Sequence, residues 1–270
     1  MKKLSQLLAF PLIILTVLLS VACSKRGDEK NSPAVIARNA EFDQKLNSLT
    51  VDTDIAHFHQ LLGQPASQKQ REITSINRVI KRHARPRSVE EKFTYIEYLY
   101  PNDHFYVQVV TDEAGKVGMY SITAIDADYS PTIQTVVGKP LQLGKTVYAD
   151  FSPAARKIAA DFSGNAAKPN YYEVVVGSGA DPQYVVVSTN PVGQIGKMGK
   201  LTNKDGGTLI KWFSLNGHDF PLDEEHGIFR QNTTINTYTE VAPWFRGVDN
   251  SGDGANFGDA ALNFGPPASP

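Results

Sequence analysis

The sequence predicts an α+β fold made of two tandem modules, each a helix followed by a three-stranded antiparallel meander, with a C-terminal β extension. Three observations lead to this prediction. Apolar residues recur at helical spacing over residues 55–62, between a capping signal and a stop signal. Runs rich in β-branched and aromatic residues then alternate with turn residues. The pattern of this meander returns later in the chain.

The first residues have the pattern of an export signal. Lys2 and Lys3 precede a mostly apolar stretch, residues 7–22, that ends in small residues. A charged start, a short apolar core and a small residue before the break are typical of a secretory signal peptide.

Cys23 follows this stretch directly and is the only cysteine in the chain. A lone cysteine after Ala22 resembles the lipobox of bacterial lipoproteins, although Ser20 departs from the usual leucine. The resemblance implies that Cys23 becomes the lipidated first residue of the mature chain, and Ser24 after it resembles outer-membrane sorting. The alternative is an uncleaved N-terminal anchor. Both interpretations place the rest of the chain in a bacterial cell envelope, membrane-anchored and facing the periplasm.

The composition of the chain limits the function classes. An apolar content of 41% with 10% aromatic residues is enough for a hydrophobic core without disulfide bonds. The formal net charge of -1 gives no argument for binding nucleic acid, and we expect none as a partner. The predicted segments are a signal peptide at 1–22, a lipidated tether at 23–49, a first α+β module with a basic helical insertion at 50–128, a second α+β module at 129–200, a C-terminal β extension at 201–246 and a flexible tail at 247–270.

The first module begins with the helix over residues 55–62. Asp52 or Thr53 is expected to cap this helix, and Gly63, with Pro65 two residues later, to end it. The meander after it is predicted to have strands at 93–100, 105–111 and 117–125, separated by turn residues.

A strongly basic stretch separates the helix from the meander. Residues 69–87 hold seven cations against Glu72 alone, and Ile73, Ile76 and Ile80 recur at helical spacing. We therefore expect a basic amphipathic helix that ends before Pro86. Its clustered cations are the candidate contacts to an acidic partner or to lipid headgroups: Arg78, Lys81, Arg82, Arg85 and Arg87. The alternative is an ordinary solvated face.

The meander recurs with an offset of 76 to 78 residues. Tyr95 and Glu97 match Tyr171 and Glu173, and the residues after Tyr106 match those after Tyr184. A helix over residues 152–163 is expected before the second copy, because Ser152 and Pro153 suit a cap and a first helical position and Gly164 suits its end. Further strands are expected at 208–215, 227–230 and 234–241.

Three short motifs connect this pattern with known families. Leu62-Gly63-Gln64-Pro65 ends the first helix, Asp112-Glu113-Ala114-Gly115-Lys116-Val117 forms the last turn of the first meander, and Leu143-Gly144-Lys145-Thr146 precedes the second copy. Behind a lipidated tether, this pattern is similar to the SmpA/BamE-type outer-membrane assembly lipoproteins and to the tandem units of β-lactamase inhibitor proteins. The resemblance implies a general role in protein contact. The basic insertion and the C-terminal region depart from both families.

Other candidate sites have simpler explanations. The repeated Tyr and Glu pairs of the two copies are interpreted as packed rings beside solvated carboxylates. Residues 249–254 resemble the start of a calcium loop, but Ala260 occupies the position of its bidentate acid, so no metal is expected. The six histidines lack zinc-ligand spacing, no nucleophile motif occurs, and no cofactor is expected.

These observations favour a non-enzymatic cell-envelope lipoprotein that binds another protein, as an assembly factor does. One alternative is a periplasmic enzyme acting on an envelope polymer, which would need two convergent carboxylates. The available acids are Asp112, Glu113, Asp126, Asp128 and Glu240. A second alternative is a small-ligand or lipid carrier with a large apolar cavity.

Overall fold

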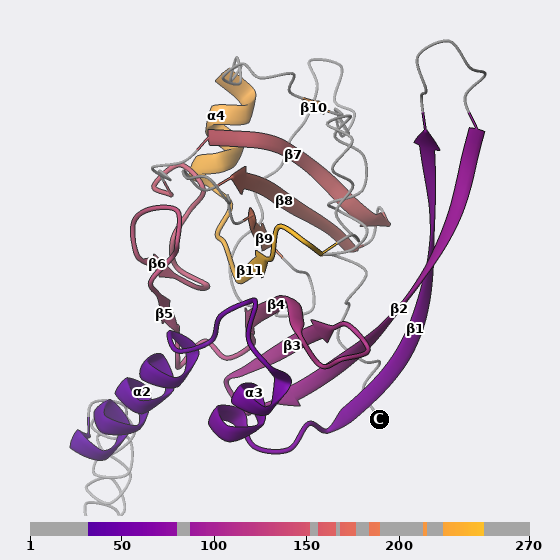
Figure 1. Ribbon diagram of the computed structural model, residues 1–270. Helices are drawn as coiled ribbons and strands as arrows, with labels where there is room; N and C mark the ends of the chain where they lie inside the picture. Colours follow the sequence, from indigo (N-terminus) through magenta and orange to yellow (C-terminus); the bar gives the residue numbers. More distant parts are fainter. Residues whose placement is uncertain are drawn as a thin grey trace, which may run out of the picture. The chain divides into compact units, whose positions relative to one another are not determined.

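The computed structural model describes residues 32–79, 87–151, 156–165, 168–176, 184–189, 213–214 and 224–245 (Figure 1). The chain divides into two units, Met1–Gln44 and Lys45–Pro270, and the strands all lie in the second. The helices are α2 (Pro33–Leu46), α3 (Ile55–Leu62) and α4 (Glu224–Gln231).

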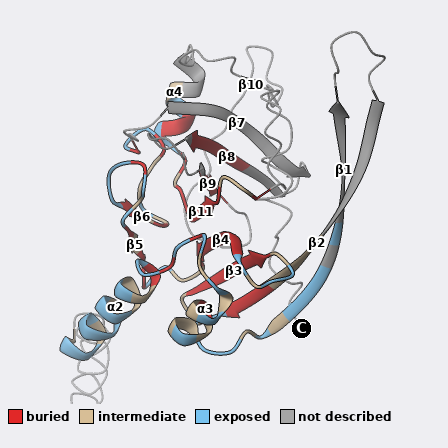
Figure 2. Ribbon diagram, in the orientation of Figure 1, coloured by how far each residue is buried: buried red, intermediate tan, exposed pale blue. Residues whose placement is uncertain are grey.

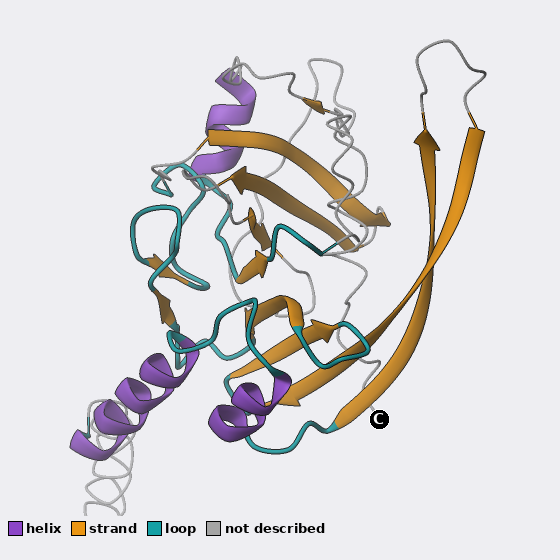
Figure 3. Ribbon diagram, viewed as in Figure 1, coloured by secondary structure: helices purple, strands orange, loops and turns teal. Residues whose placement is uncertain are grey.

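One antiparallel sheet dominates the second unit, as Figure 3 shows by the extent of its strands. Its strand order is β1-β2-β3-β4-β11-β9-β8-β7-β10. The strands are β1 (Ser67–Val79), β2 (Arg87–Pro101), β3 (Phe105–Thr111), β4 (Val117–Ala124), β7 (Arg156–Asn165), β8 (Lys168–Val176), β9 (Tyr184–Thr189), β10 (Phe213–Ser214) and β11 (Thr237–Val241). A separate two-stranded sheet pairs β5 (Thr132–Ile133) with β6 (Leu141–Gln142).

The prediction of two tandem modules, each a helix with a three-stranded meander, is wrong. Both meanders belong to a single sheet, which β11 joins into one by pairing with β4 on one side and with β9 on the other. A strand from the C-terminal end of the described chain thus closes the gap between the two halves. This long-range insertion leaves no local signal in the sequence.

The expected basic helix is also wrong, because residues 69–79 of this stretch belong to β1. Residues 80–86 lie outside the described residues. Strands β1 and β2 pair in antiparallel register from Ser67↔Leu99 to Val79↔Arg87. Ile73 and Ile76 do recur at helical spacing, but β-branched side chains favour strands, and β2 brings more of them, with aromatic residues, to the pairing. Pairing with β2 therefore makes this stretch a strand, although its isoleucines recur at helical spacing.

The helix expected at residues 152–163 is replaced by β7, which pairs with β8 and has an irregularity between Lys157 and Ala159. Short apolar runs fit a helix or a buried strand equally well by period alone. The prediction of a strand at residues 227–230 is also wrong, because this stretch lies in the helix α4.

The bounds predicted for the first helix are confirmed, but its cap is not Asp52 or Thr53, and the first strand of the meander begins at Arg87 instead of residue 93. Helix α3 spans Ile55–Leu62, with Asp54 as its N-cap: its carboxylate accepts from the Ala56 amide at 2.7 Å. Gly63 ends the helix at φ 86°, a conformation that glycine adopts without strain. Strand β3 has the expected bounds, and β4 ends one residue early. Helix α2 was not expected, although Ser32 caps it through its hydroxyl and Pro33 begins it.

The two helices of the second unit cover the same face of the sheet. The register places Tyr120, Glu240, Val185 and Val175 in one row across β4, β11, β9 and β8. Phe58 of α3 packs against Tyr120 with ring centroids 5.6 Å apart, and Phe229 of α4 packs against Tyr171 at 4.8 Å. We call this the helix face. The core residues on it are buried, as Figure 2 shows for β3, β4 and β8.

The repeated segments occupy corresponding strands with different registers. The sequence match aligns β2 with β8 and β3 with β9, and each pair is an antiparallel neighbour. Glu97 lies opposite Val110, however, whereas Glu173 lies opposite Val187, the counterpart of Val109. A shift of one residue moves a side chain to the other face. The two glutamates therefore have different settings, and only that of β8 lies on the helix face.

Candidate functional site

The predicted cationic contacts lie at the far end of the β1–β2 hairpin. Arg78 pairs with Ser88 and Arg87 with Val79 in the last two rows of its register. Lys81, Arg82 and Arg85 fall in 80–86, the segment that connects these rows along the chain, which lies outside the described residues. Arg78 and Arg87 therefore belong to a hairpin instead of a helix. Cys23 lies outside the described residues as well.

Most of this hairpin extends past the neighbouring strand. Strand β3 pairs with β2 only from Ile96 to Pro101. The rows from Arg71↔Tyr95 to Val79↔Arg87 therefore have two strands alone, a length of about 30 Å at the usual rise per residue. We call these rows, residues 71–79 and 87–95, the arm. Figure 1 shows it reaching beyond β3.

At the base of the hairpin, the outer strand is open to solvent. Gln68, Lys69 and Gln70 are exposed, whereas their neighbours Tyr98 and Leu99 on β2 are buried. The rows past β3 have no third strand among the described residues, and two-stranded hairpins are marginal in water. The arm is therefore the part of the sheet best suited to gain stability from a partner.

Charge is divided unevenly between the two strands of the hairpin. Strand β1 carries three cations against Glu72, while β2 carries three acids against two cations. The connecting segment adds three more cations. The cationic side of the hairpin is therefore its outer strand and its end.

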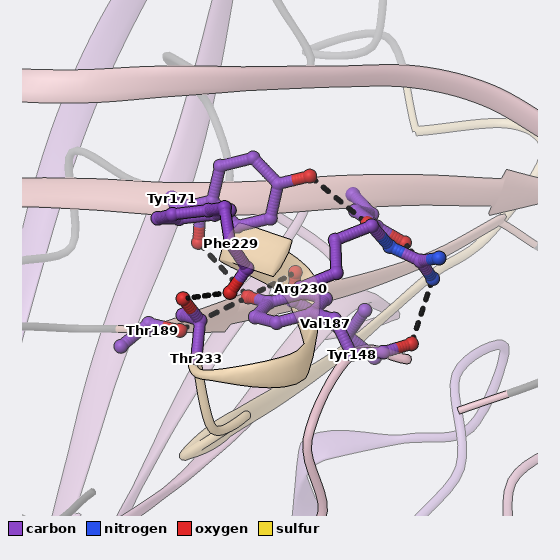
Figure 4. Close-up of polar contacts among 8 residues, drawn as sticks. Tyr148, Tyr171, Val187, Thr189, Phe229, Arg230 and Thr233 are labelled. Carbon is purple, nitrogen blue, oxygen red and sulfur yellow. Dashed lines mark hydrogen bonds and ion pairs between the residues drawn. The ribbon is translucent and has the colours of Figure 1, made fainter. Parts of the chain in front are cut away.

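A buried ion pair lies on the helix face of β8 (Figure 4). Arg230 Nε of α4 donates to Glu173 Oε1 at 2.7 Å, and the two side chains are 9% and 1% exposed. Tyr171 Oη donates to the same oxygen at 2.9 Å. Arg230 Nη2 also donates to the Tyr148 carbonyl at 2.7 Å. The interpretation of Glu173 as a solvated carboxylate is thus wrong.

Tyrosine hydroxyls complete this cluster. Tyr148 Oη donates to the Tyr171 carbonyl at 3.1 Å, and Thr189 Oγ1 lies 3.2 Å from Tyr148 Oη. Burial raises the pKa of Tyr148 and Tyr171 well above the ordinary value. Both phenols therefore stay protonated and act as hydrogen-bond donors. Since the charges and hydroxyls bind one another, this cluster joins α4, β8 and the loop after β6 and serves a structural purpose.

A second buried carboxylate lies on the same face of β11. Glu240 is 2% exposed, and its Oε2 accepts from Tyr120 Oη at 2.9 Å and from Tyr238 Oη at 3.2 Å. Burial raises the pKa of Glu240 above its ordinary value, and hydrogen bonds from the two tyrosines and the Val51 backbone oppose this shift.

The segment before α3 closes over Glu240 and is held at its surface by a smaller cluster. Tyr120 Oη also lies 3.1 Å from the Leu49 carbonyl. Asp52, with φ 63°, contacts Trp244 Nε1 and forms an ion pair with Lys116 at 2.9 Å. Lys116 Nζ lies 4.7 Å above the Trp244 ring. This cluster connects the segment before α3 with the residues that follow β11.

The acids named for a catalytic role have separate local contacts. Asp112 accepts from the Lys116 amide in the turn before β4, and Asp126 contacts His104 Nδ1. Glu240 is buried between β11 and the segment before α3. Glu173 and Glu240 share a face, but they lie on strands separated by β9 and are staggered by two residues, so their Cα atoms are about 12 Å apart. Each is held by tyrosine hydroxyls.

No helix in the described part of the chain has both the length and the apolar character needed to cross a membrane. Among these same residues, no three His, Cys, Asp or Glu side chains are grouped so that they would hold a metal ion. Comparisons with protein-family models, with curated proteins and with solved structures find no match to this chain.

Sequence reasoning missed the pairing of Arg230 with Glu173. The two residues are 57 positions apart, and α4 was expected to be a strand. One local signal existed. Tyr171 and Glu173 are two residues apart, so in a strand their side chains lie on the same face. If Tyr171 packs in the core, Glu173 must therefore also point toward the core. The solvated interpretation overlooked this geometry.

Proposed function

We propose that this chain is a non-enzymatic lipoprotein of the bacterial cell envelope, lipidated at Cys23, that binds another protein through the β1–β2 arm. The observation that carries the proposal is the shape and charge of the arm. Its nine rows past β3 have no third strand, and cations concentrate on its outer strand and at its end. Such an arm offers backbone and charge to a partner without exposing the core.

The sheet behind the arm supports a binding role more than a catalytic one. Its two buried carboxylates, Glu173 and Glu240, are occupied by tyrosine hydroxyls and, in one case, by Arg230. Polar groups that bind one another are stabilising elements, so neither of these two acids is free for chemistry on a substrate. The arm is the feature that the stability of the sheet does not require.

Site-specific photo-cross-linking in living cells tests the proposal. A photoreactive residue at Thr74 in the arm is expected to form a defined adduct with one envelope protein. The matched control is the same residue at Gln60, an exposed position of α3, which should form no such adduct. Reversing the charges of Arg78, Lys81, Arg82 and Arg85 together is expected to weaken the Thr74 adduct, because charge guides the approach.

The outcomes separate the parts of the proposal. Equal adducts from Thr74 and Gln60, or none from either, would remove the arm from the binding role. An undiminished adduct after charge reversal would keep the arm but remove its cations. For the anchor, Cys23→Ala is expected to move the chain from the membrane fraction to the soluble fraction; if it stays with the membrane, the lipidation proposal fails.

A further inference from the structure

Among the described strands, β1 is the edge strand at one end of the sheet and is hydrogen-bonded to β2 alone. Its outer side therefore presents a row of backbone N–H and C=O groups beside which no other described strand lies. The row extends over 13 residues, about 43 Å at the usual rise. Edges of this kind accept an added strand from another chain.

Proteins protect open edges in a few ways: short strands, bulges, prolines or charges. Strand β1 is long, contains no proline, and its register with β2 runs without a shift from the first pair to the last. The pairs β3–β4 and β7–β8, inside the sheet, each have a register irregularity. Among the described residues, the charges on β1 are the feature that restricts what can pair with it, so charge selects the partner.

The charges on β1 indicate which chain fits. A strand added at the open edge would lie beside Lys69, Arg71 and Arg78, with Glu72 as the one acid. The acids of the hairpin, Glu90, Glu91 and Glu97, lie on the inner strand β2 and would be one strand farther away. Opposite charges on neighbouring strands stabilise pairing and like charges oppose it. A second copy of β1 is therefore a poor partner, and an acidic segment is a good one.

We infer that β1 accepts an extended, acidic segment of the partner protein as an additional strand of the sheet. This inference rests on the proposed function and specifies how the arm binds. The backbone groups of β1 supply the hydrogen bonds, and its cations supply the preference for acids. Addition of a third strand also stabilises the arm, which has only two strands in the rows past β3.

Hydrogen exchange of the full-length chain, solubilised in detergent, tests the inference. The probe is a ten-residue synthetic peptide of alternating Glu and Val, and the control is the same peptide with Lys in place of Glu. In β1, N–H groups of alternate residues point outward. We therefore expect the acidic peptide to slow the exchange of every second amide in Ser67–Val79 by at least tenfold, and the basic peptide to slow none.

A matched pair of variants tests the role of the outer strand. Arg71→Glu is expected to weaken binding of the acidic peptide at least fivefold. The control Lys92→Glu introduces the same kind of charge change on β2, opposite Thr74, and should leave binding within twofold. Equal weakening by both variants would mean that the peptide responds to the total charge of the arm, which contradicts strand addition.

The failure of this inference differs from the failure of the proposed function. If the acidic peptide binds without slowing the alternate β1 amides, strand addition is wrong while a charged docking arm remains. If the peptide does not bind and Thr74 gives no adduct in cells, both proposals are wrong. An adduct at Thr74 without peptide binding would refute the acidic strand alone.

Discussion

Arg230 of α4 and Glu173 of β8 form an ion pair inside the protein, with Nε 2.7 Å from Oε1 and with 9% and 1% of the side chains exposed. Neither charge can recover its hydration while the protein stays folded. Tyr171 and the Tyr148 carbonyl supply further hydrogen bonds to the pair. The cluster thus holds the second half of the sheet to the one helix that covers it among the described residues.

Replacing Arg230 with Met should destabilise the protein by about 3–5 kcal/mol, because the change leaves Glu173 buried without its cation. Urea unfolding at neutral pH measures the loss. The double variant Arg230→Met with Glu173→Leu should recover a large part of it, since no unpaired charge remains. A double variant as unstable as the sum of the two single variants would show that the residues are not coupled.

Glu240 should make stability depend on pH. Its pKa is raised by burial above the ordinary value of 4.5, so the folded state holds the proton more tightly than the unfolded state. Stability from this group is present below pH 4.5 and is lost as pH rises through the folded pKa, at no more than about 1.4 kcal/mol per pH unit. Glu240→Gln should remove this loss.

The measurement is the free energy of unfolding of the native protein and of Glu240→Gln from pH 4 upward. The variant should gain relative to the native protein as pH rises. Glu113→Gln, at an exposed turn position, is the control and should follow the native curve. A difference between the native protein and Glu240→Gln that stays constant with pH contradicts the prediction.

Gly118 allows the close approach of Phe245 to β4. A Cβ at this position would lie 2.2 Å from Cδ2 of the ring, so Gly118→Ala should cost about 1–3 kcal/mol of stability. Thermal unfolding measures the change, and adding Phe245→Ala should reduce the cost of the alanine. Gly227→Ala in α4 meets nothing within 4 Å and should be neutral or stabilising by up to about 1 kcal/mol.

The arm should open far more readily than the sheet. Amides in residues 71–79 and 87–95 that are hydrogen-bonded between β1 and β2 have no third strand to support them. Their hydrogen exchange should proceed through local opening, while the amides of β4, β11 and β9 exchange near the global free energy of unfolding. Equal protection of arm and central strands would show that another element supports the arm.

The elements that sequence reasoning placed correctly are held by local interactions. The turn before β4 is an example: Asp112 accepts from the Lys116 amide, and Gly115 adopts φ 84°. Helix α3 likewise has its cap and its stop within the helix ends themselves. Such signals act between neighbouring residues, so they can be read from the sequence.

The wrong elements depend on partners distant in the sequence. Strand β7 needs β8 beside it, and β1 needs β2; without a partner, the residues of β7 and β1 fit a helical pattern. The insertion of β11 between β4 and β9 joins segments more than forty residues apart, and no local residue type marks it. The ion pair of Arg230 with Glu173 depends on that assembly, so it could not be found before the strand order was known.

The repeat shows a similar limit. Matching residues correctly identified corresponding strands, β2 with β8 and β3 with β9. Pairing register is set by side-chain packing and by bulges, and here it differs by one residue between the copies. Residues that match in the repeat, such as Glu97 and Glu173, therefore have different environments.

Removal of the arm tests the central claim most directly. Residues 71–95 are replaced by an Asn-Gly turn that joins Gln70 to Ile96, the last row in which β2 also pairs with β3. The shortened protein is expected to keep its free energy of unfolding within about 1 kcal/mol, because a two-stranded ribbon adds little stability. It should no longer recover the partner that the full-length chain cross-links in the envelope. A shortened protein that folds and recovers the same partner in the same amount would contradict the account.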